Sequence, residues 1–103
     1  MSIEYLGVVA SSEKVPTLPI LRKILDQIEL VEIVKEQEST LSILYPRGSS
    51  EVNEWGEDAC LEILARGIYL VFHSSTENDR ELFVNRLTQQ FKNIGITISF
   101  EED

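Results

Sequence analysis

The segment from Ile68 to Phe100 most constrains what this chain can fold into, because it carries three different hydrophobic patterns in direct succession. Residues 68–73 are the most apolar run of the chain and are typical of a central strand. Residues 96–100 alternate between apolar and polar side chains, as a last strand would. Between them lies a stretch of helical spacing that a weak capping box at Thr76 and Asp79 would start and Gly95 would end. Its inward stripe is formed by Leu82, Phe83, Leu87, Phe91 and Ile94.

The N-terminal part of the chain repeats this order of strand and helix. Residues 3–10 form a nearly continuous apolar run, as expected of a strand that is covered on both faces. Thr17 is expected to cap the helix that follows, and Pro19 is tolerated in its first turn. Because a helix between two strands acts as a crossover connection, we predict that part of the sheet is parallel.

The middle of the chain reads as a hairpin followed by a short helix. Residues 29–35 fit either a continued helix or a strand, and their β-branched side chains favour the strand. Residues 40–45 alternate as a half-buried strand, so a polar turn at 36–39 would join the two as an antiparallel pair. From about Glu57 the pattern suits a short helix, with Gly67 as the residue that follows its end.

Together these elements predict one domain over residues 1–103. Its class is α+β, with a mixed sheet of about five strands and helices packed mainly on one face. The order of the first elements has ferredoxin-like character, because it matches the split arrangement of strand, helix and strand.

The charge balance is unfavourable for several kinds of partner. The chain has 9 basic and 18 acidic residues, which give a formal net charge of −9 at pH 7. A field of that sign repels phosphate backbones and anionic membrane surfaces, so binding to nucleic acid or membranes is disfavoured. The N-terminus resembles no signal peptide, and the lone Cys60 fits a reducing compartment, so we expect a cytoplasmic protein.

Reactive groups are sparse along the chain. His73 is the single histidine and Cys60 the single cysteine, and no metal-ligand or phosphate-loop spacing is present. We expect Cys60 to be a buried structural thiol and His73 to cap the turn after its strand. The alternative is a small enzyme that uses one of these two side chains. The favoured interpretation is a protein without catalytic residues, metal or cofactor.

The acidic stretch around the single tryptophan carries most of the functional information. An exposed Trp55 would anchor a protein interface, and the carboxylates around it would attract a basic partner. The candidate partner-binding residues are Glu51, Glu54, Trp55, Glu57, Asp58 and Glu62. In the alternative interpretation Trp55 covers the core, and the acids at 57 and 58 only favour a helix start. Calcium binding is a weaker option, because the EF-hand pattern is absent.

By its size, its acidity and its lack of a catalytic set, the whole chain resembles bacterial immunity proteins, including those of contact-dependent inhibition systems. The resemblance is one of type and rests on no shared motif, so no contact residue carries over. It implies binding to a cognate basic toxin, often a nuclease, whose active site is occluded. The alternative function is a small-molecule regulatory or sensor domain of ferredoxin-like type, with a pocket at a homodimer interface.

Overall fold

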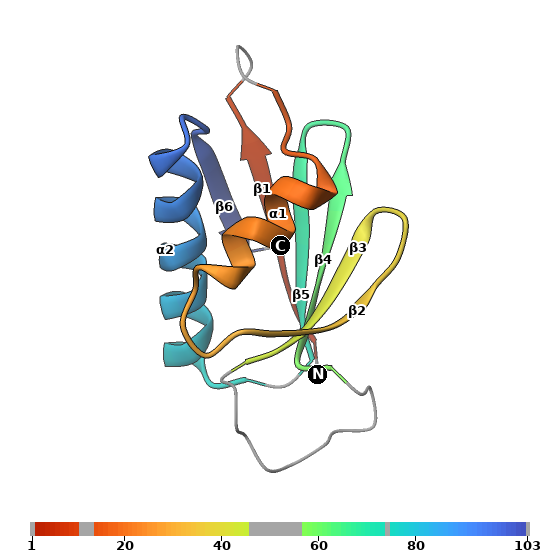
Figure 1. Cartoon of the computed structure of the whole chain (residues 1–103). Helices are drawn as coiled ribbons and strands as arrows, with labels where there is room; N and C mark the ends of the chain where they lie inside the picture. Colours follow the sequence, from red (N-terminus) through yellow and green to blue (C-terminus); the bar gives the residue numbers. More distant parts are fainter. Residues whose placement is uncertain (1, 11–13, 46–56, 74, 103) are drawn as a thin grey trace.

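Figure 1 presents a computed structural model, which describes residues 2–10, 14–45, 57–73 and 75–102. The predicted α+β class is confirmed, although the sheet has six strands, more than the sequence analysis expected. Along the chain, the elements are β1 (Ile3–Val9), α1 (Leu18–Asp26), β2 (Glu32–Glu36), β3 (Thr40–Leu44), β4 (Ala59–Leu64), β5 (Gly67–Phe72), α2 (Glu77–Asn93) and β6 (Ile98–Glu102).

The prediction of a partly parallel sheet is wrong. All hydrogen-bonded neighbours among the described strands are antiparallel, in the order β2-β3-β4-β5-β1-β6. Helix α2 does join two strands that point the same way, β5 and β6, but β1 lies between them and pairs with both. Helix α1 likewise joins β1 to β2, with β5, β4 and β3 between them. A helix that joins two strands thus makes them point the same way, but it does not make them neighbours in the sheet.

The short helix predicted from about Glu57 is also wrong, because residues 59–64 form strand β4. The odd-numbered side chains of β4 pack toward the core, and the even-numbered ones point away from it. Strand β4 pairs with β3 over residues 59–62 and with β5 over residues 59–64, so both of its neighbours stabilise an extended backbone. Gly67, expected just after a helix end, instead begins β5.

Other local predictions are confirmed. Of the ambiguous segment at 29–35, residues 32–35 belong to strand β2, which pairs with β3 through one register shift near Ile33, whereas residues 29–31 precede the strand. Thr76 caps α2, because its side-chain oxygen accepts a hydrogen bond from the Asp79 backbone N–H at 3.1 Å. Gly95 follows α2 with a φ of +86°, a left-handed conformation that glycine adopts without steric cost. Thr17 stands at the N-cap of α1 without a side-chain capping bond.

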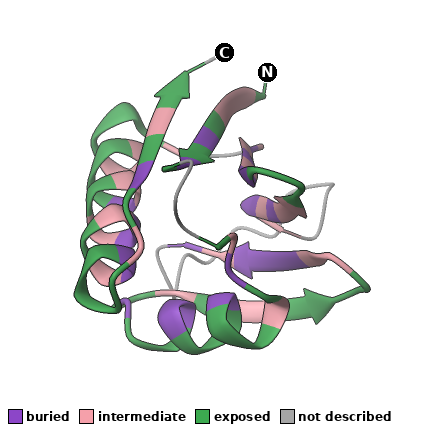
Figure 2. Cartoon of the chain, turned by 90° about the horizontal axis from the view of Figure 1, so that it is seen from above, coloured by how far each residue is buried: buried purple, intermediate pink, exposed green. Residues whose placement is uncertain are grey.

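Both helices contribute to a single core on one face of the sheet. Figure 1 shows α1 in front of the strands and α2 alongside β6, and in Figure 2 the buried side of α2 is turned toward the sheet. The ring of Phe83 in α2 lies 5.7 Å from that of Phe72 in β5 and 5.2 Å from that of Tyr45. These aromatic contacts join α2 to the middle of the sheet. Neither of the described helices has the length and apolar content that a membrane span requires.

Candidate functional site

The side of the sheet that points away from both helices forms a second surface, which we call the open face. Its members follow from strand alternation and the pairing register, since residues directly opposite one another point to the same side. On the five strands from β3 to β6 in the sheet order, the open face comprises Thr40, Ser42, Leu44, Cys60, Glu62, Leu64, Tyr69, Val71, Glu4, Leu6, Val8, Ser99 and Glu101.

An apolar strip crosses the open face over β1, β5 and β4. Leu6 lies opposite Tyr69 on one side and Glu101 on the other, and Tyr69 in turn lies opposite Glu62. In this row of residues across the sheet, Leu6 and Tyr69 therefore lie between the carboxylates of Glu101 and Glu62. The neighbouring row holds Val8 and Leu64, which are 47% and 36% exposed. This strip was not expected from the sequence, because the apolar run at 3–10 is typical of a strand covered on both faces.

A shallow hollow of about 300 Å³ lies next to this strip. It brings together two of the predicted partner-binding residues, Glu57 and Glu62, with the two candidate reactive side chains, Cys60 and His73. Its other lining residues are Thr40, Tyr69 and Val71. The hollow therefore combines an aromatic ring with acidic side chains from separate segments.

His73 lies at the edge of this hollow, just after β5. Its ring Nε2 is 3.2 Å from a carboxylate oxygen of Glu57, and its Nδ1 is 3.3 Å from the hydroxyl of Ser2. Its backbone N–H donates a hydrogen bond of 2.8 Å to the carbonyl oxygen of Asp58. These contacts tie the end of β5 to the start of β4 and to the N-terminal residues, which is a structural arrangement.

Cys60 lies on β4 between Ser42 and Val71 of the neighbouring strands, and it is half-buried where full burial was expected. Burial is the main cause that raises the pKa of its thiol, and the nearby Glu57 carboxylate raises it further. A hydrogen bond with Ser42 offsets this only in part. Because the pKa is raised, the protonated thiol dominates at neutral pH, and such a group is a poor nucleophile.

The predicted partner-binding residues take different positions. Glu57 and Glu62 line the hollow, whereas Asp58 is buried, with only 4% of its surface exposed. The Asp58 carboxylate accepts a hydrogen bond of 2.8 Å from the backbone N–H of Tyr45, which continues the junction of β3 and β4. The remaining candidates, Glu51, Glu54 and Trp55, lie outside the described residues.

The position of Asp58 predicts a large effect on stability. Replacing Asp58 with alanine leaves the buried N–H of Tyr45 without this acceptor, so we expect the free energy of unfolding to fall by about 2 kcal/mol. Urea denaturation followed by circular dichroism measures this change. Glu38→Ala, an exposed site in the turn between β2 and β3, serves as the control and should change it by less than about 0.5 kcal/mol. Equal effects of the two variants would contradict a structural role for Asp58.

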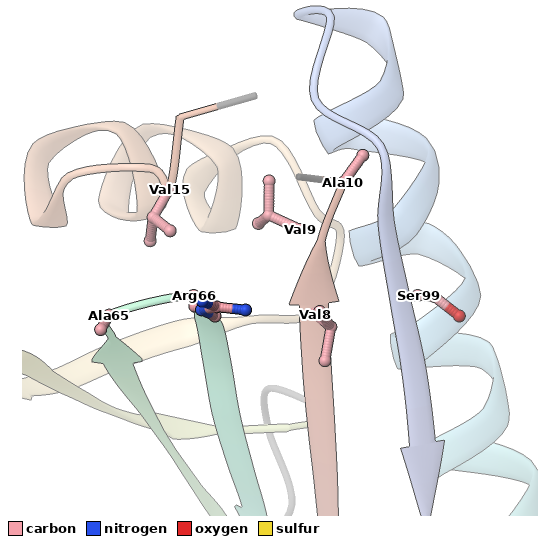
Figure 3. Close-up of a pocket in the computed structure, with 7 residues that line it drawn as sticks. All are labelled: Val8, Val9, Ala10, Val15, Ala65, Arg66 and Ser99. Carbon is pink, nitrogen blue, oxygen red and sulfur yellow. The ribbon is translucent and has the colours of Figure 1, made fainter. Parts of the chain in front are cut away.

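A larger cleft of about 560 Å³ lies at the other end of the sheet, where β1 ends and the turn between β4 and β5 approaches it. Figure 3 shows Arg66 between Ala65 and Val8, with Val15 on the side of α1. The other lining residues are Val9, Ala10 and Ser99. The cleft is therefore mostly apolar and carries one cation.

Neither a candidate metal centre among the described residues nor a match to a known protein indicates a function. Within the described ranges, no group of three or more His, Cys, Asp or Glu side chains is placed to hold a metal ion. Comparison with protein-family models, curated protein sequences and solved structures finds no match. A function for this chain therefore has to be inferred from its own surfaces.

Proposed function

We propose that this chain is a protein-binding domain that docks a basic partner on its open face and catalyses no reaction. The observation that carries this proposal is the apolar strip of Leu6, Val8 and Leu64, which lies exposed on the helix-free side of the sheet. An exposed apolar patch with a polar rim is typical of a protein interaction site.

The side chains on the open face of β1 make the interaction argument stronger. In an antiparallel sheet with one covered face, the solvent-facing positions are commonly polar. Here Leu6 and Val8 take two of those positions in the interior of the sheet, between β5 and β6. A partner that covers this strip would remove apolar surface from water and gain about 25 cal/mol for each Å².

The charges around the strip define the chemistry of the partner. Glu62 and Glu101 flank Tyr69 and Leu6 in their row across the sheet, and Glu57 lines the adjacent hollow. The whole chain adds a net charge of −9, which would attract a basic protein from a distance and raise its association rate. Glu51, Glu54 and Trp55 belong to the proposed contact surface on the sequence argument alone.

A toxin with nuclease activity would fit this chemistry. A nuclease has to attract a polyanionic substrate, so its cleft is basic, and an acidic protein that occupies the cleft excludes the nucleic acid. This mode of action is the one that the resemblance to immunity proteins implies. We therefore propose a basic toxin as the partner and occlusion of its active site as the mechanism.

Charge reversal on the open face tests the proposal. The natural probe is the purified product of the gene next to the one that encodes this chain, provided that it is basic. Glu62→Lys is expected to lower the association rate constant at least about tenfold at low salt. Glu81→Lys changes the net charge equally but lies exposed on α2, so a much smaller effect is expected there. Stopped-flow or biolayer measurements at two salt concentrations give both rates.

Two further results decide the outcome. Leu6→Ser should weaken the complex by about 1 kcal/mol, mainly through faster dissociation, because it removes apolar contact area. If Glu62→Lys and Glu81→Lys lower the association rate equally, and Leu6→Ser leaves dissociation unchanged, the open face is not the contact surface. The absence of any binding or inhibition at low salt would reject this probe protein as the partner and, with it, the toxin proposal.

A further inference from the structure

We propose that the cleft beside Arg66 binds a small apolar carboxylic acid, with the carboxylate on the Arg66 guanidinium and the apolar tail on the valines of the cleft. This site lies at the end of the sheet where the turn between β4 and β5 meets β1 (Figure 3). It is separate from the acidic hollow of the open face, although Val8 belongs both to the cleft and to the apolar strip, and the proposal does not depend on a protein partner.

The backbone that carries Arg66 is held firmly against β1. The carbonyl oxygen of Arg66 accepts a hydrogen bond of 2.9 Å from the backbone N–H of Val9. The next residue, Gly67, approaches β1 so closely that a Cβ atom there would lie 1.7 Å from the carbonyl oxygen of Gly7. Because the backbone of Arg66 is held by β1, the position from which the guanidinium extends is set before a ligand arrives.

The charge of Arg66 stands out in this acidic chain. Among the described residues, none of those that line the cleft is acidic, and no carboxylate lies within ion-pair distance of the Arg66 guanidinium. By contrast, Arg22 on α1 is paired with Glu36 at 3.2 Å. With respect to the described carboxylates, Arg66 is therefore an unpaired cation in a chain of net charge −9, and it offers an anion-binding position.

The lining selects the class of ligand. A guanidinium can donate two parallel hydrogen bonds to one carboxylate, which fits a ligand with a single negative charge. A phosphate dianion is better served by several backbone N–H donors or by more than one cation, and the described lining offers one cation. Val8 on the open face and Val15 on the side of α1 border the cleft and provide apolar contacts for the rest of the molecule. A cleft of about 560 Å³ has room for a short alkyl or aromatic acid.

A titration with octanoate, followed by two-dimensional amide NMR, tests this site. Octanol, which has the same tail without the charge, and octylammonium, which has the opposite charge, serve as matched probes. We expect octanoate to shift the amide signals of Val8, Val15 and Arg66, and to bind at least tenfold more tightly than the other two. Arg66→Gln should reduce octanoate affinity at least tenfold, whereas Arg22→Gln on α1 should leave it unchanged.

A second variant separates the tail from the charge. Val8→Ser, at an exposed site where loss of fold is not expected, should weaken octanoate binding by about threefold while leaving the preference over octanol intact. The proposal is overturned if octanol binds as tightly as octanoate, if Arg66→Gln binds octanoate like the unaltered chain, or if the shifts occur away from the cleft. Arg66→Gln should keep its affinity for a basic protein partner, so the two proposals can fail separately.

Discussion

Replacing Gly67 with alanine is expected to lower the free energy of unfolding by about 3 kcal/mol or more. The added Cβ atom would lie 1.7 Å from the carbonyl oxygen of Gly7 and 2.8 Å from its carbonyl carbon. These atoms belong to the backbone of β1 and cannot rotate away, so β1 and β5 would have to separate. The contact between these strands is central to the sheet, because β1 also carries β6. Urea denaturation monitored by circular dichroism gives the change.

Two other glycines provide controls for this prediction. An alanine at Gly7 would meet the ring of Phe100 at 2.5 Å, and a ring can turn or shift where a backbone cannot. An alanine at Gly95 would have open space around it, so its cost should be about 1 kcal/mol, from the left-handed backbone alone. If Gly67→Ala were no more destabilising than Gly95→Ala, the close approach of β1 and β5 would be wrong.

Replacing Phe83 with alanine is expected to lower the free energy of unfolding by about 4 kcal/mol. The side chain is fully buried, and its ring contacts those of Phe72 on β5 and Tyr45 at the end of β3. The substitution therefore leaves a cavity where α2 meets the sheet, and it removes two aromatic contacts at once. Thermal and urea denaturation should both report the loss.

Leu82, the preceding residue, is a matched control for this substitution. It lies on the same helix but is 42% exposed, so Leu82→Ala should change the free energy of unfolding by less than about 1 kcal/mol. Similar losses for the two variants would mean that α2 does not present the Phe83 side to the sheet. The control also shows whether a change in helix propensity contributes.

Helix α2 could be predicted well from the sequence because its signals are local. Thr76 forms a cap with a residue three positions later, and Gly95 ends the helix. Of the predicted inward stripe at helical spacing, Phe83, Leu87 and Phe91 are buried, whereas Leu82 and Ile94 are exposed. Each of these features depends on side chains within a turn of one another. The same holds for β2, where β-branched residues favoured the strand that is observed.

Strand β4 could not be predicted in this way. Its run from Ala59 to Leu64 is short, and alternation and helical spacing cannot be distinguished over so few residues. Hydrogen bonds from β3 and β5 on both sides decide its conformation, and these strands lie elsewhere in the sequence. The mistaken helix also placed Glu57, Asp58 and Glu62 on one expected surface, whereas the sheet buries Asp58 and turns Glu62 to the open face.

By itself, the sequence determined the α+β class, the acidic charge, the helices α1 and α2 and the scarcity of reactive side chains. Each of these features depends on composition or on neighbours within a few residues. Only the tertiary structure decided the antiparallel order of the sheet, the exposure of Leu6 and Val8, and the cleft at Arg66. Those features arise where strands far apart in the chain come into register. No local pattern specifies which two strands will meet, since that choice depends on how all six pack together.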